Sequence, residues 1–138
     1  MNQWTSHRVR SEGDQRLFDE RSPIYQQIAE QIKAQIVAGE IRPGDQVMST
    51  NQYAEFYRIN PATAAKGFHQ LVEEGVLYKK RGIGMFVSPD AYDRLRRQRR
   101  ERFFADVVDP MVAEAKLIGI DLADVVTRIK ANEEDDGR

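Results

Sequence analysis

Apolar residues recur at helical spacing near the start of the chain and predict an amphipathic helix with one buried stripe. The stripe consists of Ile24, Ile28, Ile32 and Ile36, with Val37 beside the last. Ser22-Pro23 predicts the start of this helix, with Ser22 as N-cap and Pro23 at the first helical position. Gly39 predicts its end, and Pro43-Gly44 marks a turn.

Two shorter helices are predicted next. Ser49 and Gln52 have the spacing of a capping box, ahead of a helix of about two turns with the apolar residues Tyr53, Ala54, Phe56 and Tyr57. Asn60-Pro61 then opens a helix that ends at Gly75 and has the inner stripe Ala64, Phe68, Leu71 and Val72. The tight connection Arg58-Ile59-Asn60 between two short helices is typical of a helix-turn-helix.

A β-hairpin with a basic tip is predicted directly after the third helix. Residues 76–80 and 85–87 are β-prone, and Arg81-Gly82-Ile83-Gly84 between them supplies the turn. A basic hairpin in this position is the wing of a winged helix-turn-helix.

The rest of the chain predicts two helices. Ser88-Pro89 opens the first, and Pro110 inside its pattern predicts a kink or a break. Gly119 ends it, and Asp121 caps a last helix that frays from Asn132. The first helix has the apolar stripe Phe104, Val108, Met111, Ala115 and Ile118, and the last helix directs Leu122, Val125, Val126 and Ile129 inward.

The predicted fold class is mainly α with a small β-hairpin, namely a winged helix-turn-helix DNA-binding domain followed by a short two-helix dimerisation region. We expect a flexible arm at residues 1–16, the winged helix at 17–88, the helical region at 89–132 and an acidic tail at 133–138. A helix pair of this size buries too little surface to be stable alone. Burial of its apolar stripe in a homodimer is the simplest way to stabilise this helix pair.

Charge is concentrated in one zone of a nearly neutral chain. The 138 residues have a net charge of −1, but lysines and arginines gather between Lys79 and Arg102, which suits a polyanionic partner. A solvated helix face explains the same run of charge. The chain has no cysteine, which excludes disulfides and thiolate metal sites. With no apolar run of about 20 residues and no signal-peptide core, we expect a cytoplasmic protein without membrane association.

The sequence offers no catalytic or metal-binding constellation. Its two histidines, His7 and His69, are far apart, and neither paired carboxylates nor a nucleophile–base pattern is present. We therefore expect no enzymatic activity, no cofactor and no metal. The alternative to a DNA-binding regulator is a winged-helix protein-interaction module.

From about Phe18 to Val87 the sequence resembles the GntR family of transcription regulators. The resemblance is carried by residues 22–28, 39–45, Ser49, Ala54, 60–63, 71–75 and 81–87. Residues 115–120, with Pro110 and the short C-terminal region, are similar to the YtrA subfamily, as is Asn60-Pro61. The chain departs from many members at residues 48–51, where a Pro-Ser-Glu-Arg run is common, and at Pro61 and Ala65, where basic residues are common. Base preference is therefore not transferable.

The resemblance implies a dimeric repressor that binds a palindromic double-stranded operator and controls its own operon and ABC-transporter genes. We expect a small-molecule effector, whose identity the sequence does not reveal, to release it. Activation instead of repression stays open.

Candidate DNA contacts follow from the expected geometry. The first turns of the second helix of a helix-turn-helix enter the major groove, helix N-termini suit phosphate, and a wing can place Arg in the minor groove. The candidates are Ser49, Asn51, Asn60, Ala62, Thr63, Lys66, Lys79, Lys80, Arg81 and Gly82. Ser49 is equally explained as a structural cap, and Gly82 as a turn residue. The arginines from Arg94 to Arg102 can contact DNA, form ion pairs with acidic residues of the partner subunit, or be solvated. The candidate dimer-interface residues are Phe104, Val108, Met111, Ala115 and Ile118.

Overall fold

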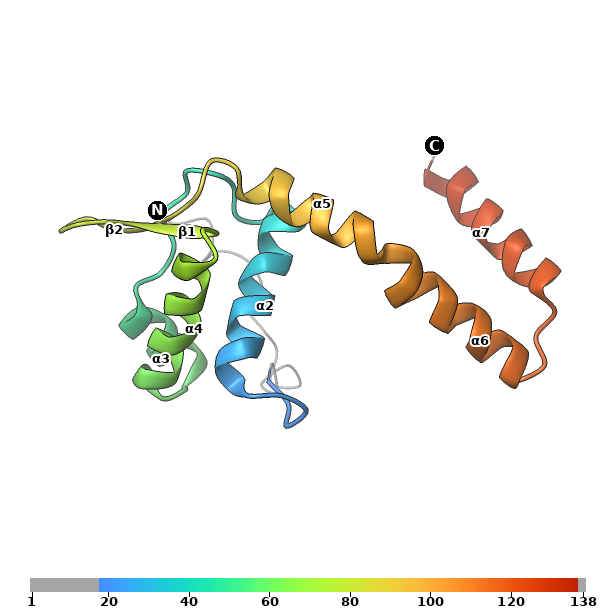
Figure 1. The fold of residues 1–138 in the computed structure, drawn as a ribbon, viewed down its shortest axis with the longest axis horizontal. Coiled ribbons are helices and arrows are strands. Elements are labelled where there is room, and N and C mark those ends of the chain that lie inside the picture. Colours follow the sequence, from blue (N-terminus) through green and yellow to red (C-terminus); the bar gives the residue numbers. More distant parts are fainter. Residues whose placement is uncertain (1–17, 137–138) are drawn as a thin grey trace. The chain divides into compact units, whose positions relative to one another are not determined.

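The structure, a computed structural model, describes residues 18–136 and is mainly helical with one β-hairpin, as predicted (Figure 1). The predicted arm at residues 1–16 lies outside the described residues. The described elements are α2 (Ile24–Val37), α3 (Thr50–Tyr57), α4 (Pro61–Glu73), β1 (Leu77–Lys80), β2 (Gly84–Val87), α5 (Ala91–Phe103), the π-helix η2 (Phe104–Val108), α6 (Asp109–Leu117) and α7 (Leu122–Asp136). The chain divides into two compact units between Arg96 and Arg97, inside α5.

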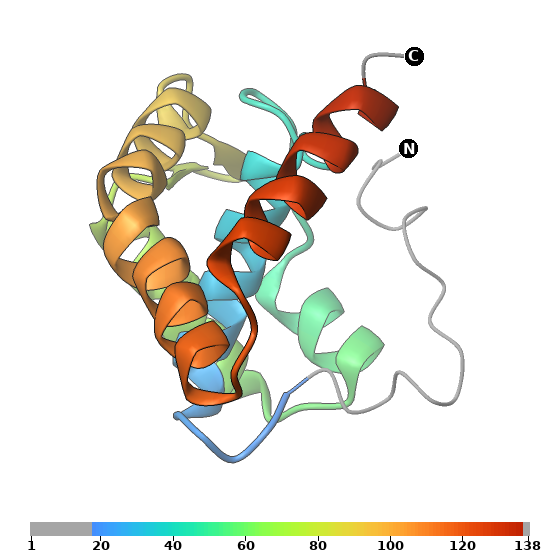
Figure 2. The same cartoon turned by 90° about the vertical axis from the view of Figure 1, so that its right-hand side faces the viewer.

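The core of the first unit lies between α2, α3 and α4. The predicted isoleucine stripe of α2 is buried from Ile28 to Ile36 and packs with Phe68 and Leu71 of α4. Gly67 permits the close approach of α4 to α2, because a Cβ atom there would lie 2.9 Å from the carbonyl oxygen of Tyr25. Figure 2 shows the fold turned by 90° about the vertical axis from the view of Figure 1.

Two of the predicted helix starts have the expected caps. The hydroxyl of Ser49 accepts a hydrogen bond from the Gln52 backbone N–H over 3.1 Å, and the Gln52 side chain accepts one from the Ser49 N–H over 3.0 Å. Together these bonds form the predicted capping box. Asn60 caps α4 ahead of Pro61, also as predicted.

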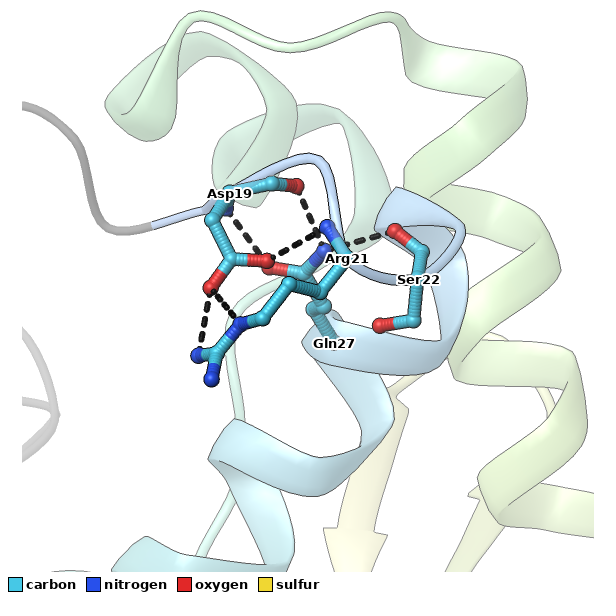
Figure 3. Close-up of polar contacts among 4 residues, drawn as sticks. All are labelled: Asp19, Arg21, Ser22 and Gln27. Carbon is cyan, nitrogen blue, oxygen red and sulfur yellow. Dashed lines mark hydrogen bonds and ion pairs between the residues drawn. The ribbon is translucent and has the colours of Figure 1, made fainter.

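The prediction that Ser22 caps the first helix is wrong. Pro23 has a ψ of 141° and is itself the N-cap, so α2 begins one residue later and Ser22 is too far away to cap it. The side chain of Gln27 stabilises this entrance instead. It accepts a hydrogen bond from the Asp19 N–H over 2.9 Å, and it donates to the carbonyl oxygens of Asp19 and Ser22, each over 2.7 Å (Figure 3).

The helix predicted to open at Ser88-Pro89 begins later, at Ala91. The backbone N–H of Ser88 donates to the carbonyl oxygen of Val76 over 2.9 Å, which binds Ser88 to the end of the hairpin. The N–H of Arg94 donates to the carbonyl oxygen of Asp90 over 3.0 Å in an i to i−4 bond. Asp90 therefore occupies the position expected for Ser88.

The hairpin is antiparallel, with Leu77 opposite Val87 and Lys80 opposite Gly84. Its second edge is covered by a segment that the sequence pattern did not reveal, since Gln46 forms a bridge with Phe86. Backbone hydrogen bonds from Val47 N–H to Met85 and from Val87 N–H to Asp45, each 2.9 Å, complete this contact.

In the second unit Pro110 does not break the helix. Proline lacks a backbone N–H, and its ring crowds the carbonyl group four residues earlier. The π-helical turn η2 accommodates both effects, so the helix continues past Pro110. The N–H of Asp109 donates to the carbonyl oxygen of Phe104, five residues back. Such a turn is a recognised way to absorb a helix irregularity.

The last helix is capped by Asp121, as predicted, through a 3.1 Å bond from the Ala123 N–H. The expectation of fraying from Asn132 is wrong, because α7 continues to Asp136. Its expected inner stripe is largely open in the single chain, where Val126 is 48% and Ile129 52% exposed. None of the helices in residues 18–136 is long and apolar enough to cross a membrane.

Candidate nucleic-acid interface

The N-terminal turns of α4 present the central group of predicted contact residues. Oδ1 of Asn60 accepts hydrogen bonds from the backbone N–H groups of Ala62, over 2.7 Å, and Thr63, over 3.4 Å. Ala62 and Lys66 are exposed, and Thr63 is half-buried. The cap thus consumes two N–H groups that could have faced a phosphate, while the methyl group of Ala62 and the side chain of Lys66 stay accessible.

Lys66 also has a partner within the domain. Its Nζ lies 4.1 Å from the centroid of the Tyr25 ring on α2, a distance at which cation and ring attract each other. Sequence periodicity placed Lys66 on the outer face of α4 but gave no sign of this contact. This contact links the exposed side of α4 to α2.

The N-terminus of α3 supplies a second group. Ser49 and Asn51 are both exposed, and Ser49 is engaged in its capping box. The Ser49 hydroxyl accepts the cap bond, which leaves its own proton available to a phosphate oxygen.

The wing presents a third group, which consists of Lys79, Lys80, Arg81 and Gly82, all exposed. Nζ of Lys80 lies 4.7 Å from the centroid of the Phe86 ring, so this ammonium packs on the hairpin face. Gly82 has a φ of +78°, a conformation that the turn requires and that glycine adopts readily. Nothing lies within 4 Å of its Cβ position, so the turn is open to solvent at this residue. Figure 1 shows the hairpin projecting beyond the helices of its unit.

Two wing features were missed in the sequence. Ile83 at the tip is 63% exposed, an apolar side chain in an otherwise basic turn. Nε2 of Gln46 donates a hydrogen bond to the carbonyl oxygen of Ile83 over 3.0 Å. Gln46 is distant in sequence from the wing, and no local pattern could have indicated this contact.

The predicted dimer-interface residues all lie in the second unit. Phe104 is 68%, Ile118 58% and Met111 38% exposed, whereas Ala115 is buried within the single chain. Val108 is half-buried. Other large apolar side chains of this unit are also exposed, among them Phe103, Val107, Leu117, Ile120 and Leu122.

The described residues contain no group of three or more His, Cys, Asp and Glu side chains that could hold a metal ion. His69 lies on the outer face of α4 and its Nε2 is 2.6 Å from a carboxylate oxygen of Glu73. His7 lies outside the described residues.

Comparison with known proteins identifies the first unit. Residues 24–87 match the sequence model described as bacterial regulatory proteins, gntR family. The chain is 46% identical over 66 residues to the transcriptional repressor NagR of Bacillus subtilis, a match that covers 48% of this chain and 27% of NagR. The chain thus spans about a quarter of that relative.

Two further proteins are similar over most of the chain. It is 30% identical over 107 residues to the transcriptional repressor YtrA of Bacillus subtilis, covering 76% of this chain and 82% of YtrA. A solved GntR family transcriptional regulator from Listeria monocytogenes has a TM-score of 0.66 and 26% identity, and the match covers 83% of this chain and 98% of that one. The similarity therefore includes the C-terminal helices.

Proposed function

The chain belongs to the gntR family of bacterial regulatory proteins, in the YtrA subfamily, and from this premise we propose that it binds a palindromic operator as a homodimer. The main support for the proposal is the combination of elements in the first unit. It joins a capped helix-turn-helix to a hairpin with an exposed basic tip.

Recognition begins with α4, whose first turns enter the major groove. Thr63 and Lys66 reach base edges or phosphates, and the methyl group of Ala62 contacts a thymine methyl. The ammonium of Lys66 exchanges its Tyr25 ring for DNA at little cost, because an exposed cation–π contact is worth only about 0.5–1 kcal/mol.

Backbone contacts hold this helix in register. Ser49, Asn51 and Asn60 at the helix N-termini face phosphates, as do Lys79 and Lys80 of the wing. Arg81 and Gly82 approach the adjacent minor groove, where the potential is negative. Phosphate contacts supply affinity and orientation, whereas the base contacts supply specificity.

The second unit joins the two copies. Its large apolar side chains, Phe104, Met111 and Ile118 among them, are exposed to solvent in the single chain. Exposed apolar patches mark interaction sites, and a dimer would bury these side chains. Val108 completes the interface, while Ala115 supports it from within the helix pair.

In the cell we expect repression of the protein's own operon and of ABC-transporter genes, relieved by a small-molecule effector. The relatives NagR and YtrA are named as repressors, and this supports a regulatory role without catalysis. We expect the protein to act in the cytoplasm, where its DNA is.

Footprinting on DNA upstream of the gene tests the proposal. The account predicts two protected half-sites related by a two-fold axis, separated by one helical turn or a multiple of it. Protection of a single unrepeated segment would contradict the dimeric mode. Absence of protection at all concentrations would favour the protein-interaction alternative.

A further inference from the structure

Ile83 is an apolar side chain at the tip of a basic hairpin. It is 63% exposed, and the exposed side chains that precede it in the wing, Lys79, Lys80 and Arg81, all carry positive charge. A single exposed apolar residue is ordinary on a protein surface. The contacts that hold Ile83, and the charge around it, therefore decide what this side chain can do.

The backbone of Ile83 is held from both sides. Its N–H donates a hydrogen bond to the carbonyl oxygen of Lys80 over 2.9 Å, which closes the turn at the tip. Its carbonyl oxygen accepts the 3.0 Å hydrogen bond from Nε2 of Gln46, and Gln46 is joined to the hairpin by its bridge with Phe86. Branching at Cβ also restricts the χ1 rotamers of isoleucine. The wing thus presents this side chain from a fixed backbone.

The tip of the wing is narrow around Ile83. Within residues 82–84, Ile83 alone has a side chain, because Gly82 precedes it and Gly84 follows it. Nothing lies within 4 Å of a Cβ position at Gly82. Glycine allows the backbone to approach a ligand closely, so the tip can enter a narrow groove together with the isoleucine side chain.

The charge around Ile83 indicates which surface it meets. Lys79, Lys80 and Arg81 suit a polyanion, and the minor groove of DNA has an enhanced negative potential where A·T pairs narrow it. With α4 in the major groove, the wing reaches the adjacent minor groove, as proposed above. The basic side chains favour entry into this groove, and the isoleucine meets the edges of the bases.

We propose that Ile83 enters this minor groove and selects A·T over G·C pairs at the wing tip, because it excludes the exocyclic amino group of guanine. The inference rests on the proposed function and adds a base-reading residue to it. In the minor groove A·T and T·A pairs present only acceptors, whereas a G·C pair adds the N2 amino donor. Isoleucine displaces water from both kinds of pair, but only at the G·C pair does it leave a desolvated donor without a partner.

The first experiment locates the base pairs beneath the wing tip. The chain has no cysteine, so Ile83→Cys gives a single attachment point for an iron chelate that cleaves nearby DNA. We expect cleavage across the minor groove beside each half-site of the footprinted operator. Absence of cleavage beside the half-sites would overturn the inference, because the wing tip would then lie away from the DNA.

The second experiment measures operator affinity with an A·T, a G·C or an inosine·cytosine pair at those positions. Inosine has the major-groove edge of guanine but lacks the minor-groove amino group. The wild type should bind the A·T duplex about tenfold more tightly than the G·C duplex, and inosine·cytosine should restore most of the lost affinity. Equal weakness of the inosine·cytosine and G·C duplexes would overturn the inference.

Two variants of Ile83 and one control assign the preference to this side chain. Ile83→Ala should remove most of the preference, and Ile83→Gln should remove all of it, since its amide oxygen accepts a hydrogen bond from the guanine amino group. Because Ile83 is exposed, both variants should keep the wild-type free energy of unfolding. Arg81→Ala is the matched control in the same turn. It should weaken binding to all three duplexes by a similar factor and keep the preference.

A preference that survives in Ile83→Ala would overturn the inference. A preference that disappears in Arg81→Ala alone would overturn it as well, since arginine would then read the groove by its width and potential. Neither result affects the proposed function, which fails instead if the operator is bound no better than an unrelated duplex.

Discussion

The side-chain amide of Gln46 holds the wing at its tip, through a 3.0 Å hydrogen bond to the carbonyl oxygen of Ile83. The same amide fills the space beside Gly84, where a Cβ atom would lie 2.5 Å from Nε2. Gly84 also has a φ of +143°, a region that side chains rarely adopt. The wing therefore depends on a glycine and on a residue outside the hairpin.

We predict that Gly84→Ala lowers the free energy of unfolding by about 1–3 kcal/mol and weakens DNA binding. Denaturant unfolding measures the first effect and anisotropy the second. Gly44→Ala is the control, because Gly44 has a φ of +88° but nothing within 4 Å of its Cβ position. If both variants lose equal stability, the contact with Gln46 is not what limits position 84.

Asn60 allows its capping role to be separated from DNA contact. Asn60→Ala should lower the free energy of unfolding by about 1 kcal/mol, because two backbone N–H groups lose their acceptor. Asn60→Asp retains the acceptor and should preserve stability, yet its negative charge beside a phosphate should weaken operator binding. Wild-type affinity in Asn60→Asp would remove Asn60 from the phosphate contacts.

The ion pair of Glu74 and Lys33 makes stability depend on pH. Burial alone would raise the pKa of Glu74, but hydrogen bonds from Lys33 and Gln70 and the nearby charges of Lys33 and Arg94 outweigh it and lower the pKa. A carboxylate with a lowered pKa stabilises the fold above its unfolded value, near 4.5, and loses that contribution as the pH falls through the folded value.

We therefore predict that Glu74→Gln makes unfolding free energy fall less steeply than in the wild type as the pH is lowered from 5 to 3. Glu55→Gln, an exposed position on α3, is the control and should keep the wild-type slope. The pKa of Lys33 is raised. Burial alone would lower this pKa, but the hydrogen bonds and charges of Glu74 and Glu30 outweigh burial. Its contribution should be lost only at strongly alkaline pH. Identical acid-side curves for Glu74→Gln and the wild type would contradict the account.

The apolar stripe of the second unit gives a prediction for assembly. Phe104→Asp places a charge in the proposed interface and should raise the dimer dissociation constant by at least about tenfold, since burial of an unpaired charge is costly. Ala113→Asp is the control: Ala113 is exposed on α6, and helical spacing places it on the side opposite Met111 and Ala115, so this change should leave the dimer intact. Sedimentation equilibrium distinguishes them, and an unchanged dimer in Phe104→Asp would place the interface elsewhere.

Sequence pattern predicted most of the fold because its signals are local. The capping box of Ser49 and the Asn60-Pro61 start depend on residues within one helical turn, and both are present. Ser22 failed as a cap because Pro23 is extended and the Gln27 side chain takes over the helix entrance.

Several contacts in and around the candidate site could not be predicted from such local patterns. Gln46 meets Ile83 across 37 positions of sequence, and Arg94 meets Glu74 across 20. Contacts of this kind exist only after the helices and the hairpin have packed. The run from Arg94 to Arg102 was therefore open to several explanations in sequence, and the structure gives Arg94 a role inside the domain.

The central claim is that this chain is a sequence-specific operator binder, and a salt-dependent anisotropy titration tests it most directly. Purified protein is titrated into labelled duplex from upstream of its gene, with an unrelated duplex as control. We predict a dissociation constant of about 10⁻⁸ M or below, a wide margin over the control, and a log–log salt slope of about −0.9 per neutralised phosphate. Equal weak binding to both duplexes, or binding that does not respond to salt, would contradict the claim.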